Sequence, residues 1–307
     1  MARYVYGPVP SRRLGRSLGV DLVPLKTCSL NCVFCQLGRT LQPTIERAEY
    51  VPTDAVVEEV RERLREGVPL DYITLGGSGE PTLHSSFGIV AEQIRSFSRV
   101  PIALLTNGSL FYLPDVRAAC RAISVILPTL DAGDEETFRR VHRPHPDLTL
   151  ERIVQGLVAL RQEYAGQIWL EVFLVPGLNT SDEEVRKIQA QIERIRPDRI
   201  DLNTAVRPPA EGFVKPVPPE RLAQIRDMLG PKARVIAEMA VVPTPLEMAA
   251  TAKDALEMIR RRPCTLEDIA AGLSIHPSEA VKLIQRLLAE GKVTEVLAGG
   301  RRFYRPR

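Results

Sequence analysis

Three of the five cysteines in this chain lie within eight residues, at Cys28, Cys32 and Cys35. This Cys-x3-Cys-x2-Cys spacing places three soft thiolate ligands on one loop. A structural zinc site usually takes four protein ligands, and the nearest downstream histidine, His84, is far along the chain. Three thiolates on one loop instead suit a cubane iron–sulfur cluster, with three irons held by the protein and one iron left open. The spacing therefore predicts a cluster that can bind a small ligand and act on it.

The stretch GGSGEPTL, from Gly76 to Leu83, is the second candidate site. Glycines allow backbone polar atoms to approach a ligand closely. A phosphate-binding loop is the competing interpretation, but the stretch lacks the Gly-Lys-Ser/Thr ending of such a loop. Plain turn formation also stays open, because glycine and proline dominate turns.

Short β-rich runs alternate with amphipathic helical patterns before the proline-rich stretch 207–220. We expect strands at 17–24, 71–77, 101–108, 122–132, 168–177 and 198–206, with helices at 53–67, 85–97, 114–121, 148–164 and 181–195. Strands separated by helices imply right-handed crossovers and a parallel sheet. Six such units predict an α/β fold, either an open doubly wound sheet or a partial β/α barrel. In both, the active site lies in loops beyond the carboxyl ends of the strands, where the cysteines and GGSGEP stand.

The cysteine spacing, with the aromatic Phe34 before the third cysteine, resembles the signature of the radical S-adenosylmethionine (radical SAM) superfamily. The resemblance covers about residues 15–206 and implies that the six βα units form that family's partial (β/α)6 barrel. It also implies two cofactors: a [4Fe-4S] cluster ligated by Cys28, Cys32 and Cys35, and S-adenosylmethionine bound to the open iron. In that superfamily an electron from the reduced cluster cleaves the sulfonium C–S bond. The resulting 5′-deoxyadenosyl radical abstracts hydrogen from a substrate.

The resemblance also assigns residues to cofactor binding. GGSGEP resembles the family's Gly-Gly-Glu-Pro-like motif, whose backbone holds the amino group of the cofactor's methionine part. It departs from that motif by the inserted Ser78 and Gly79, so the glycine that faces the cofactor stays open. The candidate contacts are Phe34, Gly76, Gly77, Gly79, Glu80, Pro81, Thr106, Asn107, Asp131 and Glu171. Glu171 and Asn203 alternate with apolar neighbours, which favours the barrel interior as much as a solvated strand face.

Four arginines are candidate substrate contacts: Arg12, Arg13, Arg16 and Arg207. The first three precede the first expected strand, and Arg207 follows the sixth. Because we expect those two strands to be the edges of a six-stranded partial barrel, the four side chains are predicted to meet near its mouth. Guanidinium groups there would suit a carboxylate or a phosphate of the substrate. Solvated surface arginines are an equal alternative.

Three functions stay open at this level. The first is a radical SAM enzyme that acts on a small molecule or on a nucleoside, nucleosides within tRNA included. The stretch GPVPSRRLGRSLGVDLVPLKTCSLNCVFCQLGRT resembles a poorly characterised group related to wyosine-type tRNA-modifying enzymes, a similarity at the level of the family that does not establish the substrate. The second is a glycyl-radical activase or a peptide-modifying enzyme. A radical SAM enzyme of the first or the second class also needs a reductant such as ferredoxin or flavodoxin. The third is a redox-sensing regulator that keeps its cluster without catalysis, although the intact cofactor loops argue against it.

The C-terminal residues show helix, turn, helix and hairpin, which resembles a winged helix-turn-helix domain. Thr265 and Asp268 predict a capping box, and Gly299 with Gly300 predicts a hairpin turn. The expected domains are a radical SAM core with its extensions (1–243), a linker helix (244–263) and a winged-helix domain (264–307). Its open roles are nucleic-acid binding, peptide recognition, and plain dimerisation or packing. The basic residues that could meet phosphates are Lys282, Arg286, Lys292, Arg301, Arg302 and Arg305.

Composition sets the outer limits. The 307 residues are 44% apolar and 26% charged, with a net charge of +3, which is ordinary for a globular protein. The segment 251–307 holds 11 Lys/Arg and 7 Asp/Glu, a mildly basic end that permits contact with a polyanion without requiring it. Clustered cysteines in odd number do not suggest disulfides, and Cys120 and Cys264 are expected to be buried small residues. Without a long apolar run or a secretory signal, we expect a cytoplasmic protein with no membrane contact.

Overall fold

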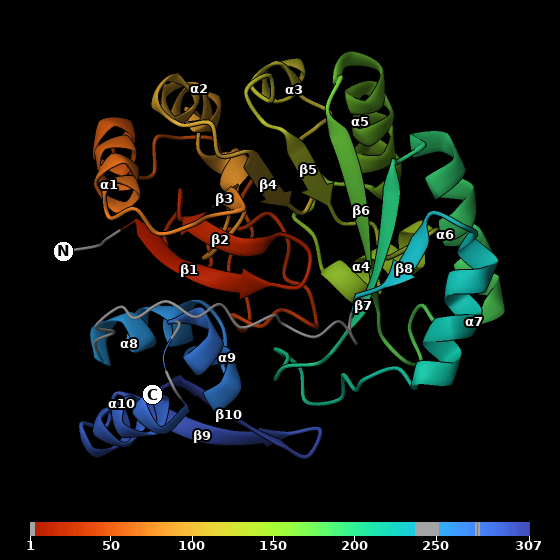
Figure 1. Ribbon diagram of the computed structural model, residues 1–307. Coiled ribbons are helices and arrows are strands. Elements are labelled where there is room, and N and C mark those ends of the chain that lie inside the picture. The colour runs from red at the N-terminus through yellow and green to blue at the C-terminus, as the bar shows by residue number, and fades with distance from the viewer. Residues whose placement is uncertain (1–3, 237–251, 274, 276) are drawn as a thin grey trace.

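The computed structural model describes residues 4–236, 252–273, 275 and 277–307. At its centre is one eight-stranded sheet in which each strand pairs with the next along the chain (Figure 1). The strands are β1 (Val5–Ser11), β2 (Gly15–Val20), β3 (Tyr72–Leu75), β4 (Ile102–Thr106), β5 (Val125–Pro128), β6 (Gln167–Leu174), β7 (Arg199–Thr204) and β8 (Ala233–Val235). From β2 to β8 the neighbours are parallel, whereas β1 runs antiparallel to β2. The carboxyl ends of β2 to β8 therefore meet at one edge of the sheet.

Helices connect the parallel strands. They are α1 (Thr53–Arg65), α2 (Phe87–Phe97), α3 (Pro114–Ala118), α4 (Glu135–His142), α5 (Leu150–Glu163), α6 (Asp182–Ile195) and α7 (Pro219–Leu229), and a short 3-10 turn, η1 (Pro81–Leu83), follows β3. Figure 1 shows α1, α2, α3, α5, α6 and α7 around the outside of the curved sheet. Their apolar stripes pack on outward strand residues such as Ile73 and Leu104, both 0% exposed. This burial holds the helices to the convex face.

The concave face is apolar at one end and polar at the other. Leu14, in the turn between β1 and β2, packs with Ala103 of β4 and with Val125 and Leu127 of β5. That cluster fills the lower part of the barrel with side chains. Further along the strands the inward residues become polar, which leaves a functional face at the carboxyl ends.

The six expected strands are all present, as β2 to β7, and their parallel order is confirmed. The prediction that the first and sixth of them are edges is wrong, because β1 and β8 flank them. Pro8 and Pro10 hide β1 from sequence reasoning, since proline lacks the N–H that a central strand needs. β1 tolerates both because it pairs with β2 on one side only within the sheet. The helix α4 is also missed.

The C-terminal residues form α8 (Ala252–Arg261), α9 (Leu266–Gly272), α10 (Pro277–Ala289) and an antiparallel pair, β9 (Val293–Ala298) with β10 (Arg301–Pro306). The capping box is confirmed, since Asp268 N donates to Thr265 Oγ1 at 3.1 Å and Thr265 N donates to Asp268 Oδ2 at 3.0 Å. The hairpin turn at Gly299 and Gly300 is confirmed too, with φ of 56° and 72°.

These C-terminal elements pack against β1, beneath it in Figure 1. Val9 of β1 packs against their apolar cluster. A Cβ built on Gly272 would lie 3.0 Å from Cδ of Pro10, so α9 meets β1 closely. The contact covers the sheet edge that β1 would otherwise leave open.

Some expectations fall partly outside the described residues, namely the boundary at 243 and the first part of the linker helix 244–263. The division of the chain into three domains stays a prediction. Among the helices of the described ranges, none combines the length and the apolar character needed to cross a membrane.

Candidate active site

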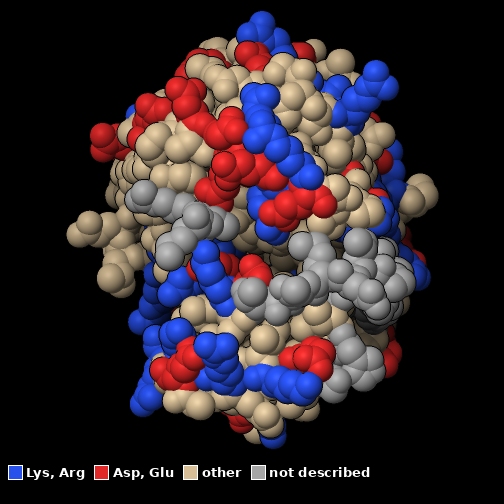
Figure 2. All heavy atoms as spheres, turned by 60° about the vertical axis from the view of Figure 1, so that its left-hand side comes forward, with Lys and Arg blue, Asp and Glu red and all other residues tan. Residues whose placement is uncertain are grey.

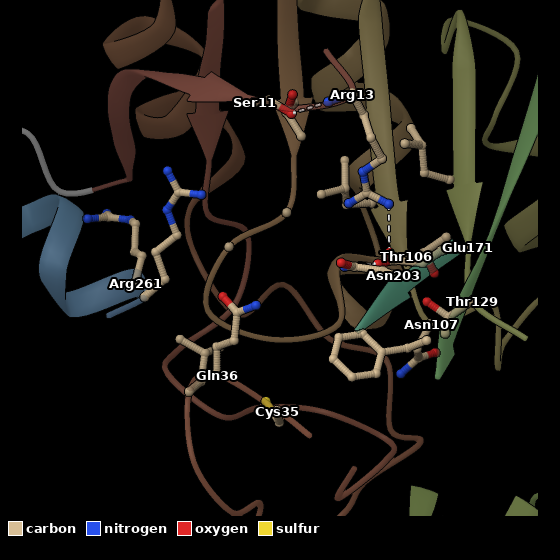
Figure 3. A pocket seen from close by; sticks show the side chains of 18 of the residues that line it. Ser11, Arg13, Cys35, Gln36, Thr106, Asn107, Thr129, Glu171, Asn203 and Arg261 are labelled. Carbon is tan, nitrogen blue, oxygen red and sulfur yellow. Dashed lines mark hydrogen bonds and ion pairs between the residues drawn. The ribbon is translucent and has the colours of Figure 1, made fainter. Parts of the chain in front are cut away.

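A cavity of about 410 Å³ lies at the carboxyl ends of the parallel strands. Its wall comes from the β1–β2 turn, the cysteine loop after β2, the glycine-rich loop after β3, the ends of β4 to β7, and the end of α8 (Figure 3). The sequence-predicted residues in its lining are Arg12, Arg13, Cys28, Cys32, Phe34, Cys35, Gly76, Gly77, Gly79, Glu80, Thr106, Asn107, Glu171, Asn203 and Arg207. The sequence-derived residues thus converge on one place.

Three predicted site residues lie outside that lining. Arg16 stands at the amino end of β2, and its Nη2 and Nε bind the carboxylate of Asp71 at 2.9 and 3.1 Å. The prediction that it meets the other arginines at the barrel mouth is therefore wrong, because its side chain pairs with Asp71, which lies outside the cavity lining. Pro81 begins η1 and is buried. Asp131 is 1% exposed and lies behind the cavity wall.

The three clustered cysteines all reach the cavity, and none of the chain's five cysteines forms a disulfide. Burial raises the pKa of Cys28 to about 12 and that of Cys32 well above its ordinary value. Thiolates at this site therefore need positive charge beside them, and Lys26 Nζ supplies some by donating to Cys35 Sγ at 3.1 Å. A bound metal cluster would supply the rest. Cys120 and Cys264 are fully buried, as expected.

The donor set fits a polynuclear cluster better than one metal ion. Within the described ranges, no three His, Cys, Asp or Glu side chains are grouped as a single metal ion requires. A cluster brings bridging sulfides of its own and therefore accepts thiolates spaced more widely around it. Three thiolates would hold three irons and leave the fourth for another ligand.

The end of α4 holds the cysteine loop in place. The backbone N–H groups of Asn31 and Val33 donate to the carbonyls of His142 and Val141, at 2.8 and 3.0 Å. Such carbonyls lack partners within their own helix. The ring of Phe34 stacks on Phe173 of β6 with centroids 4.0 Å apart. Both contacts fix the loop against the barrel.

A buried chain of side chains lies behind Cys32. Its Sγ is 3.1 Å from Nδ1 of His142, and Nε2 of His142 is 3.3 Å from Oδ2 of Asp131. Burial lowers the pKa of His142 to about 3 and raises that of Asp131 well above its ordinary value. The imidazole is thus neutral at neutral pH. Asp131 also accepts from Phe173 N at 2.5 Å, so it positions this chain and does not line the cavity.

Ion pairs of Glu211 also hold the cysteine loop in position. Arg39 binds both carboxylate oxygens of Glu211, at 2.8 and 2.7 Å, and Arg143 Nη1 binds Oε1 at 2.6 Å. The N–H of Glu211 donates to the carbonyl of Val33 at 3.0 Å. These ion pairs lower the pKa of Glu211 to about 2. Sequence reasoning misses both His142 and Glu211, because each reaches the loop only through tertiary packing.

Asp21 organises the glycine-rich loop. It accepts from the N–H and hydroxyl of Ser78, at 2.6 and 2.9 Å. A Cβ on Gly77 would lie 2.1 Å from Asp21 Oδ1, so only glycine fits there. The carbonyl of Gly76 accepts from the hydroxyl of Tyr6 at 2.8 Å. Burial raises the pKa of Asp21, and its bonds to Arg261 and Ser78 oppose that rise.

Glu80 joins the glycine-rich loop to the end of β4. Its carboxylate accepts from Thr106 Oγ1 at 2.6 Å, Asn107 N at 2.7 Å, and the N–H and hydroxyl of Thr82 at 3.0 and 2.5 Å. Burial raises its pKa, and these four bonds counter that effect. Glu80 therefore shapes the wall, and Asn107 in turn lies with Nδ2 3.5 Å from Cys28 Sγ.

Polar side chains from different strands contact one another inside the barrel. Arg13 Nη1 pairs with Oε2 of Glu171 at 2.6 Å, and Asn203 Nδ2 donates to Oε1 at 2.7 Å. Glu171 and Asn203 therefore point into the barrel, which is one of the two orientations that the sequence left open; the other was a solvated strand face. Arg12 reaches the carbonyl of Ile236 at 3.1 Å, and Arg207 lies 3.5 Å from Asp268 of α9.

The comparisons with known proteins agree with this site. Residues 22–188, more than half of the chain, match the radical SAM superfamily. The chain therefore belongs to the radical SAM superfamily, whose members use a [4Fe-4S] cluster and S-adenosylmethionine. It is a radical SAM enzyme whose substrate is unknown.

Similar proteins identify the family within this superfamily to which the chain belongs. A UPF0026 protein of Methanocaldococcus jannaschii is 32% identical over 97% of this chain and 94% of its own length. A UPF0026 protein of Helicobacter pylori is 32% identical over 98% of this chain and 96% of its own length. The chain thus belongs to the UPF0026 family. It is also 33% identical to a Brachyspira hyodysenteriae protein named GTPase Obg, but it spans only 44% of that protein's length.

A solved structure supports the architecture. The radical SAM methyltransferase from Sphaerobacter thermophilus superposes with a TM-score of 0.57 and 18% identity, over 73% of this chain and 67% of its own. The likeness concerns the fold alone. The sequence left open whether the fold is an open doubly wound sheet or a partial β/α barrel, and this likeness favours the partial barrel.

Proposed function

We propose that this protein cleaves S-adenosylmethionine reductively and uses the product radical to abstract hydrogen from a substrate that enters the same cavity. The observation that carries the proposal is the convergence of Cys28, Cys32, Cys35 and the glycine-rich loop on one cavity. When bound, the [4Fe-4S] cluster supplies the electron that breaks the sulfonium C–S bond, giving methionine and the 5′-deoxyadenosyl radical. The residues of the chain hold, orient and enclose the reacting groups.

The roles of the chain's own residues follow from their contacts. The three cysteines would ligate the cluster, and Lys26 offsets their negative charge. Gly76 and Gly77 would present backbone groups to the methionine part of the cofactor, at positions that Tyr6 and Asp21 fix. Thr106, Asn107 and Glu171 are proposed to face the ribose or the methionine part. Leu14 and Leu127, of the apolar cluster inside the barrel, would add an apolar side to this cavity.

Cofactor cleavage tests the proposal directly. The protein would be purified anaerobically, reconstituted with iron and sulfide, reduced, and assayed for conversion of S-adenosylmethionine to 5′-deoxyadenosine. We expect the product from the wild type and from Cys120→Ala, and none from Cys32→Ala. Cys120 is a matched control, because it is buried and remote from the cavity lining. Uptake of zinc in place of a cluster, or equal cleavage by Cys32→Ala, would contradict the proposal.

The electron donor is proposed to be ferredoxin or flavodoxin, in the reducing cytoplasm that the sequence predicts. The substrate is proposed to be a small molecule or a nucleoside, tRNA nucleosides included, as in the wyosine-related group. A glycyl-radical activase or a peptide-modifying enzyme is the alternative. Stimulation of 5′-deoxyadenosine release by RNA favours the first class, and stimulation by a polypeptide favours the second.

We propose that α9, α10 and the β9–β10 hairpin form a winged helix, with α8 in the linker helix that precedes it. Figure 2 shows Lys and Arg on the lower part of the molecule with Asp and Glu among them. Several of its basic side chains pair locally: Lys282 with Glu279, Arg286 and Lys292 with Glu290, and Arg302 with Glu295. These pairs reduce the charge available to phosphates, so contact with nucleic acid stays a prediction. Packing against β1 supports a role beside the barrel.

A further inference from the structure

Each of the three clustered sulfurs lies near one side-chain nitrogen. The pairs are Lys26 Nζ with Cys35 Sγ at 3.1 Å, Asn107 Nδ2 with Cys28 Sγ at 3.5 Å, and His142 Nδ1 with Cys32 Sγ at 3.1 Å. An ammonium or amide nitrogen only donates, whereas an imidazole nitrogen either donates or accepts. The effect of His142 on the sulfur therefore depends on which of its two nitrogens carries the proton.

The ring of His142 is buried between two aromatic side chains. Its side chain is 4% exposed, and its ring centroid lies 5.9 Å from that of Phe34 and 5.3 Å from that of Phe138. These contacts hold the ring with one nitrogen toward Cys32 and the other toward Asp131. Burial disfavours the charged imidazolium, so one of the two nitrogens donates and the other accepts.

The carboxyl group of Asp131 decides which nitrogen donates. Its Oδ1 accepts from Phe173 N at 2.5 Å, and its Oδ2 lies 3.3 Å from Nε2 of His142. Within the described residues, Oδ2 is buried and accepts no hydrogen bond, and no Lys or Arg pairs with this carboxyl group. A buried carboxylate without a cation and with one oxygen unpaired is costly. A neutral carboxyl group instead carries its O–H at Oδ2, where Nε2 is the acceptor within reach.

We propose that neutral Asp131 donates to Nε2 of His142, that Nδ1–H of His142 donates to Sγ of Cys32, and that this hydrogen bond raises the reduction potential of the ligated cluster. A thiolate ligand has no proton of its own and only accepts. A hydrogen bond to it strengthens as the sulfur becomes more negative, which favours the reduced state. His142 is thus a positioning residue that eases delivery of the electron. The inference rests on the proposed function for the presence of the cluster.

The test is the reduction potential of the cluster in the full-length, reconstituted protein without S-adenosylmethionine. An anaerobic titration with dithionite and redox mediators, followed by electron paramagnetic resonance, gives the fraction of cluster that is reduced. That fraction does not depend on how much cluster a variant holds. A variant that binds less iron therefore still yields its potential, which separates an effect on the cluster from a loss of structure.

Substitutions of His142 test the bond to the sulfur. In His142→Phe the equilibrium constant for reduction should fall about tenfold, which is about 59 mV for one electron. In His142→Asn most of that loss should be regained, because the amide N–H can stand in for Nδ1–H. His145→Phe is the matched control, since His145 lies in the same segment but its Nδ1 accepts from Asp147 N at 3.3 Å. It should keep the potential of the wild type.

Asp131→Asn tests the proton on the acid. Because Phe173 N holds Oδ1, the amide nitrogen of asparagine takes the place of Oδ2 and donates to Nε2 of His142 as the neutral acid does. The potential should therefore stay that of the wild type. If Asp131 were a carboxylate, its replacement would remove a negative charge near the cluster, and the potential would rise. This variant decides the question alone where His142→Phe retains no cluster.

Three results would overturn the proposal. They are an unchanged potential in His142→Phe, an equal fall in His142→Phe and His142→Asn, or a rise in Asp131→Asn. The second result would mean that the shape of the imidazole matters and its N–H does not. Because the titration involves no cofactor cleavage, its failure leaves the cleavage assay untouched, and failure of that assay leaves the potentials interpretable.

Discussion

Arg261 Nε donates to Asp21 Oδ2 at 2.8 Å, although the two residues are 240 positions apart. Their side chains are 9% and 10% exposed, so the pair is shielded from water. The guanidinium also lies over the ring of Tyr6, 4.1 Å from its centroid. Because Asp21 and Tyr6 hold the glycine-rich loop, this pair connects the C-terminal elements to the proposed cofactor site.

Arg261→Met should destabilise the protein and loosen the glycine-rich loop. Removing one partner leaves the buried carboxylate of Asp21 without its cation, which costs about 3 kcal/mol. Urea denaturation followed by circular dichroism measures that free energy. Affinity for S-adenosylmethionine should fall as well. The exposed Arg260→Met should change stability by less than about 0.5 kcal/mol, and a similar small change in Arg261→Met would show that the pair does not stabilise the fold.

Gly77→Ala should disturb the same loop from its other side. The added Cβ would lie 2.1 Å from Asp21 Oδ1 and 3.0 Å from the Tyr6 hydroxyl, so the Asp21 side chain or the loop backbone must shift. We expect S-adenosylmethionine affinity, measured by equilibrium binding to the reconstituted protein, to fall at least about tenfold, the effect of a charged hydrogen bond lost. In Gly212→Ala the new Cβ has no described atom within 4 Å, which makes it the control. Equal affinity in both variants would exclude this role of Gly77.

Local pattern was enough to predict the cysteine cluster, the six parallel strands and the capping box, because each depends on neighbours in sequence. The rest depends on distant partners. Asp21 could not be assigned to the glycine-rich loop before the fold placed it beside Ser78, and Arg16 was misplaced because Asp71 holds it at the amino end of β2. The sequence predicted the polar site residues that lie at the ends of strands. It did not predict His142 on α4 or Arg261 on α8 as site residues, because only the tertiary packing of those helices brings them to the site.

Glu211→Gln should destabilise the protein in a pH-dependent way. Arg39 and Arg143 lower the pKa of Glu211 from its ordinary 4.5 to about 2. The stabilisation is therefore fully present above pH 4.5 and is lost as the pH falls toward 2. The urea midpoint of the cluster-free wild type should exceed that of Glu211→Gln from pH 5 upward, with the difference shrinking below about pH 4.5.

Glu136→Gln is the control for this pH series, since Glu136 is 82% exposed and lies 3.8 Å from Arg140. Its urea midpoint should follow that of the wild type across the whole range. If the difference between wild type and Glu211→Gln stayed constant down to about pH 2, an uncharged packing effect would explain it instead.

Asn179→Ala should weaken the end of β6 more than its position in a loop suggests. Asn179 is 0% exposed; its Oδ1 accepts from Val175 N at 2.7 Å, and its Nδ2 donates to the carbonyls of Asp131 and Phe173, each at 2.8 Å. Alanine leaves three buried backbone groups without partners, at a cost of about 3 kcal/mol in total. Because Asp131 and Phe173 support His142 and Phe34, the variant should also bind less iron per chain after reconstitution. Thr180→Ala, at the next position, which is half-buried, should match the wild type in both measurements. If Asn179→Ala were destabilised but still bound the normal amount of iron, Asn179 would stabilise the fold without positioning the cysteine loop.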